Sequence, residues 1–153
     1  MTNTLIFDVA RPADHDQICA LNYQTFVEEI PQHPPHTSRR LVDRFHDQNT
    51  YIIARCGDEI IGMVAVRAER PFSLDGKLPD LDGELPPHSG LCEVRLLCVQ
   101  PGRRRGPVFA GLMDRLMQLG RERGYDLAVV SGTVRQLRLY QHMGFVPFGP
   151  EVG

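Results

Sequence analysis

The chain has 153 residues, of which 42% are apolar and 24% are charged, and this size and composition fit one globular domain. The 17 basic and 19 acidic side chains give a net charge of −2, which argues against a nucleic-acid module with a uniformly basic surface. The charge is divided unevenly, because residues 1–93 carry 15 acidic and 8 basic side chains whereas residues 94–153 carry 4 and 9. We therefore expect any anion site in the C-terminal part of the chain.

The sequence contains no sign of export or of membrane insertion. Its apolar runs are far shorter than the roughly 18 residues of a membrane span, and residues 1–10 lack the basic flank of a secretory signal. The four cysteines, at positions 19, 56, 92 and 98, form no C-x-x-C pair, so we expect reduced thiols and no metal site. These observations predict a cytoplasmic protein with no membrane contact.

Hydrophobic periodicity and breaker residues predict alternating strands and helices. In chain order, the predicted elements are strand 4–9, a helix from residue 12 that stops before Pro31, a helix from Thr37 or Ser38, strands 51–55 and 59–68, strand 91–99, helix 107–123, strand 126–130, helix 134–143 and strand 145–148. Residues 70–90 hold four prolines and predict a loop whose length is typical of a functional or mobile segment. The order predicts a single mixed α/β (α+β) domain over residues 1–153.

The strand–turn–helix unit at 91–123 carries the clearest chemistry. The turn at 101–106 reads PGRRRG and leads directly into a helix, whose first N–H groups are unpaired and whose dipole adds positive potential. Three consecutive arginines lie in this turn, and a planar guanidinium can bind phosphate oxygens in pairs. Pro107 fits the first helical turn but removes one N–H donor. The unit therefore predicts a phosphate or pyrophosphate site.

Residues 97–106 and 139–145 hold two motifs, and both resemble motifs of the GNAT (Gcn5-related) N-acyltransferases. Residues 97–106, LCVQPGRRRG, resemble the acyl-CoA motif of that family, which reads roughly L-x-V-x-P and then R/Q-x-x-G-x-G/A. Residues 139–145, LYQHMGF, resemble the second motif, L-Y-x-x-x-G-F, and follow at the expected spacing. Val108 stands where the family has Gly or Ala, and the turn is one residue shorter than usual.

The resemblance implies the GNAT fold, a mixed central sheet of about six strands flanked by about four helices. The family's usual final strand, which pairs with the strand at 145–148, has no counterpart before Gly153. We therefore expect that strand to be absent or the chain to be a fragment of a longer polypeptide.

The resemblance also implies roles for individual residues. The donor is acetyl-CoA or another acyl-CoA, with acyl-ACP as a further possibility, and the acceptor is an amine. Tyr140 is the expected acid for the leaving thiolate and Glu93 the expected base. The residues expected to bind the cofactor are Leu97, Cys98 and Val99 through backbone groups, then Arg103, Arg104, Arg105, Gly106, Pro107 and Val108 at the phosphates. Strand alternation predicts one face with Glu93, Arg95, Leu97 and Val99 and the opposite face with Cys92, Val94, Leu96 and Cys98.

A weaker resemblance points to the acyl-homoserine-lactone synthases and the related N-acyl amino acid synthases, which take long acyl chains from acyl carrier protein. It rests on Thr50-Tyr51, on residues 66–74, on residues 78–81 and on Glu93. It implies that Arg67 binds a substrate carboxylate. His46 and Asn49 replace acidic residues of those synthases, so S-adenosylmethionine binding is not supported.

Three functions stay open on the sequence alone. The first is acyl transfer, most simply of an acetyl group, from a CoA thioester to a small-molecule or peptide amine. The second is N-acylation of an amino acid from acyl carrier protein, and the third is a non-catalytic acyl-CoA-binding or interaction module of a larger protein. Each predicted site residue also has a structural alternative, such as a salt bridge of Glu93 with Arg67 or Arg95. A homodimer is a further expectation from the family.

Overall fold

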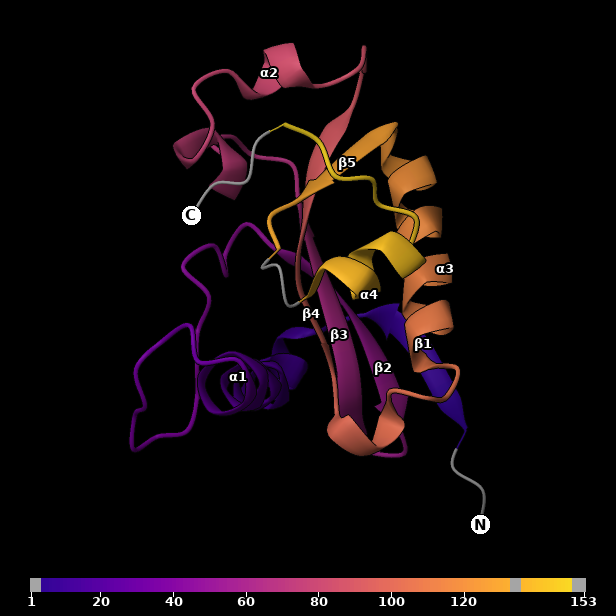
Figure 1. Ribbon diagram of the computed structural model, residues 1–153. Helices are drawn as coiled ribbons and strands as arrows, with labels where there is room; N and C mark the ends of the chain where they lie inside the picture. The colour runs from indigo at the N-terminus through magenta and orange to yellow at the C-terminus, as the bar shows by residue number, and fades with distance from the viewer. Residues whose placement is uncertain (1–3, 133–135, 150–153) are drawn as a thin grey trace.

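The computed structural model describes residues 4–132 and 136–149. A five-stranded sheet in the spatial order β1-β2-β3-β4-β5 forms its centre (Figure 1). The strands are β1 (Leu5–Val9), β2 (Thr50–Cys56), β3 (Glu59–Arg67), β4 (Leu91–Val99) and β5 (Leu127–Val130). Neighbours from β1 to β4 are antiparallel, whereas β4 and β5 are parallel. The prediction of a mixed α/β domain is thus confirmed.

Helices cover both faces of the sheet. On one face lies α1 (His15–Tyr23), which follows a 3-10 turn and continues into a π-helical turn at Gln24–Glu29. On the other face lie α3 (Val108–Arg123) and α4 (Leu137–His142), and the short α2 (Leu81–Glu84) lies in the long loop (Figure 1). No helix of the described residues is long and apolar enough to cross a lipid bilayer.

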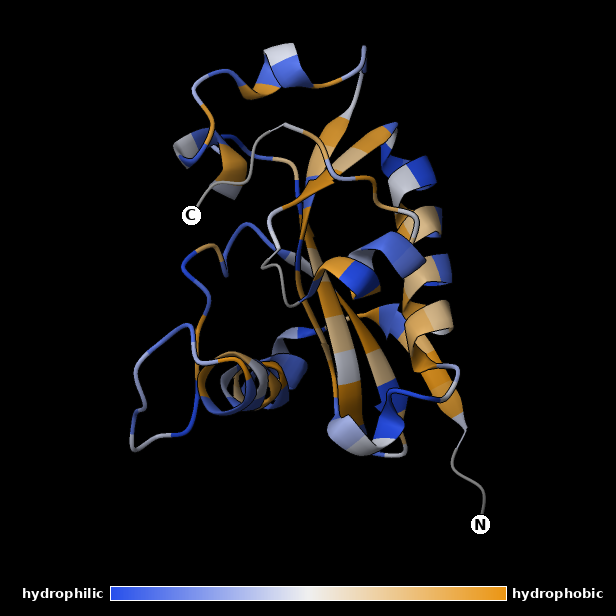
Figure 2. Cartoon of the chain, viewed as in Figure 1, coloured by the Kyte–Doolittle hydropathy of each residue, from blue (hydrophilic) through white to orange (hydrophobic). Residues whose placement is uncertain are grey.

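Two apolar clusters hold the helices to the sheet. One fills the α3 face and joins α3 to alternate residues of the strands, among them Val64, Val66, Leu112 and Leu116. The other fills the α1 face and includes Ile18, Leu21, Ile53 and Met63. The central strands are therefore apolar on both sides, and the hydrophilic residues gather in loops and on outer helix faces (Figure 2).

Two predicted elements are absent. The helix predicted from Thr37 or Ser38 is wrong, because the segment forms turns in which Arg39 has a φ of 53° and Leu41 N–H bonds to Cys19 O. The strand predicted at 145–148 is also wrong, because Phe148 packs against the long loop and the segment joins no strand ladder. The sheet therefore has five strands in the described residues. For the predicted helix 134–143 the structure has α4, and residues 134 and 135 lie outside the described residues.

A bulge in β4 changes which side chains share a face. Leu96 has a φ of 54°, and the pairing of β3 with β4 shifts between Met63 and Ala65. Leu97 consequently packs on the α3 face and Cys98 on the α1 face. The predicted alternation is therefore wrong beyond Arg95, because one extra residue reverses the order of the faces.

The long loop at residues 70–90, called the cap loop here, contains short helical turns and packs against the sheet. It contains a 3-10 turn at Ser73–Gly76 and α2, and the Arg70 side chain binds both Asp75 and Asp82. Its apolar side chains form a third cluster with β5 and the C-terminal segment: Phe72, Leu74, Leu78 and Leu81 pack with Val129, and Leu85, Leu91 and Phe148 lie against them. The segment that the sequence predicts as a loop thus folds onto the sheet as a unit.

Candidate functional site

β4 and β5 part in the middle of the sheet. Their pairing ends at Val94 and Val130, while β4 continues to Val99. Over Arg95–Val99 the β5-side edge of β4 has no strand partner among the described residues. Edge peptide groups can pair with the amides of an extended ligand, as a further strand would. The predicted backbone site at Leu97–Val99 lies on this open edge.

Tyr140 of α4 lies in the α3-face cluster, which also holds Val94, Leu97 and Val99. The side chain is 7% exposed, and its ring packs edge-on to Phe145 and closely against Gly132, where a Cβ would approach Cε2 to 2.3 Å. The hydroxyl has no hydrogen-bond partner among the described residues, and burial raises the pKa of Tyr140 to about 12. Tyr140 is therefore a protonated donor at neutral pH.

The turn after β4 leads into the N-terminus of α3. Pro107 precedes the helix, no side chain caps it, and the first helical bond runs from Gly111 N–H to Pro107 O. The N–H groups at the start of α3 therefore remain available to an anion, and the dipole of this 16-residue helix favours negative charge there.

The three arginines of the turn have different surroundings. Arg104 forms a two-pronged ion pair with Glu29 and donates from Nε to Val99 O at 2.9 Å, so it fastens the turn to the π-helical turn after α1. Arg103 is exposed and lies 3.8 Å from Cys56 Sγ, and Arg105 is exposed without a described partner. Of the three arginines of the turn, Arg103 and Arg105 are thus the two that are placed to meet a ligand from solvent.

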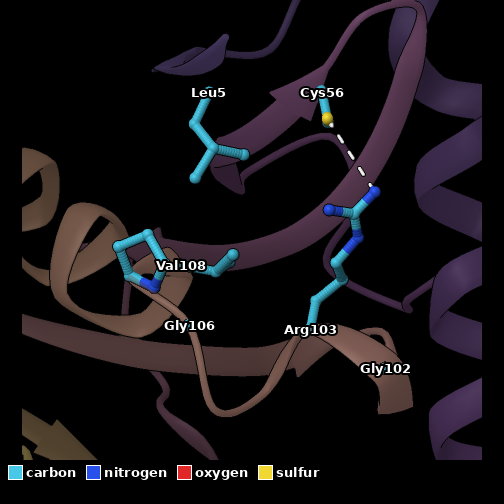
Figure 3. A pocket seen from close by; sticks show the side chains of 7 residues that line it. Leu5, Cys56, Gly102, Arg103, Gly106 and Val108 are labelled. Atoms are coloured by element: carbon cyan, nitrogen blue, oxygen red, sulfur yellow. Dashed lines mark hydrogen bonds between the residues drawn. The ribbon is translucent and has the colours of Figure 1, made fainter. Parts of the chain in front are cut away.

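A hollow of about 330 Å³ opens beside this turn (Figure 3). The residues that line it are Leu5, Cys56, Gly102, Arg103, Gly106, Pro107 and Val108. The last four are predicted phosphate-binding residues. Leu5 and Cys56 are not, because they face each other at the ends of β1 and β2 and carry no local motif.

Glu93 lies in a buried cluster of charges on the α1 face. The cluster, called the charge cluster here, consists of Asp43, Arg67, Glu93 and Arg95. Arg95 binds Asp43 at 2.7 Å and Glu93 at 3.1 Å, and Arg67 lies 3.6 Å from Glu93. Two guanidinium groups and two carboxylates balance one another, which is how buried charges are tolerated.

Arg67 is buried, and the residues around it come from several described segments of the chain. Its side chain is 1% exposed, and its guanidinium lies 3.6 Å from the centre of the Phe45 ring. Nε donates to Gln48 Oε1 at 2.8 Å and Nη1 to Pro71 O at 2.9 Å. The carboxylate-binding role of Arg67 and the base role of Glu93 both stay predictions.

Sequence reasoning brings Arg67 and Glu93 together correctly, since they are paired across β3 and β4. It misses Asp43, Phe45 and Ser73, which complete their surroundings. The helical spacing that includes Phe45 predicts a helix that does not form, Asp43 lies in irregular chain and Ser73 begins a 3-10 turn, so no pattern places these three beside Arg67 and Glu93. Arg95 gives a signal for an acidic partner, because it lies in an apolar strand and a buried guanidinium needs a carboxylate beside it.

The family of this chain follows from its similarity to a known protein family. The family of the N-acyl amino acid synthase FeeM matches residues 17–152, which is nearly the whole chain. The chain belongs to the FeeM family of N-acyl amino acid synthases. As a member of this family the protein is an acyltransferase.

Solved structures of several acetyltransferases share the fold of this FeeM family member. The aminoglycoside N-acetyltransferase AAC(6')-Iy in complex with CoA is 15% identical, with a TM-score of 0.73 over 100% of this chain and 95% of that chain. A GCN5-related N-acetyltransferase from Ralstonia eutropha is 18% identical, with a TM-score of 0.66 over 94% of each chain. An acetyltransferase from Trypanosoma brucei is 15% identical, with a TM-score of 0.64 over 97% and 96%. The GNAT fold is thereby confirmed, whereas a search of curated protein sequences finds no match.

Proposed function

We propose that the protein transfers an acyl group from a CoA thioester to an amine by direct attack. The observation that carries this proposal is the open edge of β4 from Arg95 to Val99, with the N-terminus of α3 at its end and Tyr140 packed against it. An extended pantetheine arm would pair with the edge, and its phosphates would lie at the turn. The CoA found with AAC(6')-Iy, including in a complex of that enzyme with a CoA-linked acetylneamine analogue, supports a CoA donor.

In this proposal the acceptor amine attacks the thioester carbonyl carbon, the C–N bond forms and the C–S bond breaks. The amine, which is an ammonium in water, loses one proton to solvent before the attack, and the attacking nitrogen loses a second proton to solvent as the C–S bond breaks and the amide forms. The departing thiolate takes a proton from the Tyr140 hydroxyl, which returns to its neutral form from solvent. Holding both reactants in place supplies much of the rate, and backbone N–H groups of Leu97–Val99 stabilise the charge that develops on the carbonyl oxygen.

A second candidate donor is acyl carrier protein, with an amino acid as the acceptor. The FeeM family match favours it, because the family is one of N-acyl amino acid synthases. The same phosphopantetheine arm would use the same edge, and Arg103 and Arg105 would face an acidic partner. The four cysteines are buried and form no disulfide with one another, which supports the reducing environment of the cytoplasm for either reaction.

A panel of donors and amines tests the proposal. Acetyl-CoA, a medium-chain acyl-CoA, a long-chain acyl-CoA and the matching acyl carrier proteins are each incubated with amino acids, an aminoglycoside and a short peptide, and free thiol is measured. We expect at least one pair to release thiol in proportion to N-acylated product identified by mass spectrometry. Calorimetry with CoA is expected to show saturable binding. The absence of both heat and thermal stabilisation with every thioester would overturn the proposal.

A further inference from the structure

We infer that Glu93 is a positioning residue that anchors the cap loop to the sheet and does not take the proton from the acceptor amine. The inference rests on the proposed function for its kinetic consequences, whereas the anchoring is a property of the resting protein. It assigns a different role from the one predicted for this residue. Three observations carry it: the contacts of the carboxylate, its burial, and the place where the cap loop is held.

Both carboxylate oxygens of Glu93 are engaged by the protein. Oε2 accepts a hydrogen bond from the Ser73 backbone N–H at 2.7 Å. Oε1 accepts from Arg95 Nη1 at 3.1 Å, and Ser73 Oγ lies 3.4 Å from it. The same Ser73 hydroxyl accepts from Arg95 at 2.6 Å, so serine and arginine close around the carboxylate from two sides.

Glu93 has no route to an acceptor in this arrangement. The residue is 0% exposed, beneath Ser73 of the cap loop and beside two arginines that contact the Phe45 ring. A general base must lie within hydrogen-bond reach of the proton that it removes, directly or through one water. An ammonium would reach Glu93 only if the cap loop moved away from the sheet. That movement would break the hydrogen bond between Ser73 N–H and the Glu93 carboxylate.

The cap loop is held at two points that flank the parting of the strands. Ser73 is bound to Glu93, one residue before the last β4–β5 pair, and Lys77 Nζ donates to Ser131 Oγ at 2.9 Å directly after β5. Between these points Leu74 joins the apolar cluster over Val129. The cap loop therefore crosses the α1 side of the fork between β4 and β5, whereas Tyr140 packs on the α3 side. An acceptor that reaches the open edge from the side opposite Tyr140 would contact the cap loop.

A loop in this position affects how the acceptor binds more than how fast the bound acceptor reacts. Loss of the anchor is expected to raise the KM for the acceptor, because the wall of its site is no longer preformed. The maximal rate depends on the open edge and on Tyr140, which the cap loop does not include. A catalytic base would show the opposite pattern, a lower maximal rate and loss of the acidic limb of the pH profile.

The test compares Ser73→Pro, Ser73→Ala and Glu93→Gln in the full chain. Proline removes the N–H that binds Glu93, and the site tolerates its backbone, since Ser73 begins a 3-10 turn and Phe72 is extended, with φ −82° and ψ 167°. Ser73→Ala is the matched control that keeps the N–H and removes only the hydroxyl. Hydrogen exchange of the protein without ligand is followed by mass spectrometry in peptides of the cap loop and of α3.

Ser73→Pro and Glu93→Gln are each expected to speed exchange in residues 73–81 at least about tenfold, with Ser73→Ala below about threefold and α3 unchanged. With the best donor–amine pair from the panel, we expect the acceptor KM to rise about tenfold, kcat to change less than about threefold and the acidic limb to keep its midpoint.

Two results would overturn the inference. One is a loss of kcat of about 100-fold or more in Glu93→Gln together with the acidic limb, while Ser73→Pro keeps the wild-type rate. The other is wild-type exchange in the cap loop of both variants. The exchange result decides the anchoring even if no donor is turned over, so failure of the proposed function is distinguished from failure of this inference.

Discussion

At the scale of single residues, Tyr140 differs from the other candidate site residues. Its hydroxyl has no described partner, although the ring is buried, whereas Glu93, Arg67 and Arg104 each bind side-chain and backbone groups of the protein. A residue that donates a proton to a departing group must not be committed elsewhere. This difference supports the proposal that Tyr140, and none of these three residues, protonates the departing thiolate.

We expect Tyr140→Phe to lower kcat for acyl transfer about 100-fold, because the thiolate loses its proton donor. The dissociation constant for CoA should change little, since phenylalanine keeps the packing against Phe145 and no described hydrogen bond is lost. Thiol release and calorimetry measure the two quantities. Wild-type turnover in the variant would show that Tyr140 is only a packing residue.

Residue partners are predictable from the sequence only where strands bring them together. Arg67 and Glu93 lie opposite each other on adjacent strands, and the two expected strands suffice to pair them. The partner of Arg104, in contrast, is Glu29, which is 75 residues away on the π-helical turn. Three arginines in a row look equivalent in the sequence, and only tertiary packing separates Arg104 from the other two.

At the scale of elements, α3 contains two glycines in different surroundings. Gly111 lies against the ring of Phe7, so a Cβ there would approach the ring carbon Cζ to 2.1 Å. Gly120 has open space, with Tyr125 Cβ at 4.0 Å as its nearest contact. The first glycine therefore lets α3 approach β1, whereas the second only lowers the stability of the helix.

The same substitution is thus expected to have opposite effects at these positions. Gly111→Ala should destabilise the protein by about 1–3 kcal/mol, because the ring or the helix must move. Gly120→Ala should stabilise it by about 0.5–1 kcal/mol through the higher helix propensity of alanine. Urea denaturation of the two variants beside the wild type measures both free energies of unfolding. Equal signs would contradict the close approach of α3 to β1.

The clearest sequence patterns, those of β4 and α3, predicted the bounds of these two elements closely. β4 matches its predicted bounds, and α3 ends where expected, at Gly124 with a φ of 75°. The helix predicted from residue 37 fails because Leu41 N–H and Asn22 Nδ2 form tertiary bonds that compete with helical ones. The bulge at Leu96 also could not be foreseen, since all residues from Leu96 to Val99 are apolar and fit either face.

At the scale of the whole molecule, buried tyrosine hydroxyls and cysteine thiols make the free energy of unfolding depend on pH. Burial raises the pKa of Tyr51 and Tyr140 to about 12, of Cys92 to about 11 and of Cys98 to about 12. The unfolded chain releases these protons near the ordinary values, about 10 for tyrosine and about 8.5 for cysteine. Between these values the unfolded chain binds fewer protons than the folded protein, so stability falls as pH rises.

From about pH 8 to about pH 10.5, the two tyrosines alone should lower the free energy of unfolding by about 2 kcal/mol, with the cysteines adding to the loss. Urea denaturation at these two pH values measures the difference. Tyr140→Phe should reduce it, because that variant has one proton fewer to release. A free energy of unfolding that stays constant over this range would contradict the burial of these groups.

The charge cluster also bears on the order in which parts of the protein fold. Asp43 and Arg95 are 52 residues apart, and neither can pair with the other until β2, β3 and β4 have aligned. Contacts of such long sequence separation form late, because the chain must first close the intervening loops. The hairpin of β2 and β3 can form earlier from local contacts. We therefore expect the part of the sheet that carries the charge cluster to be the last region to become native during folding.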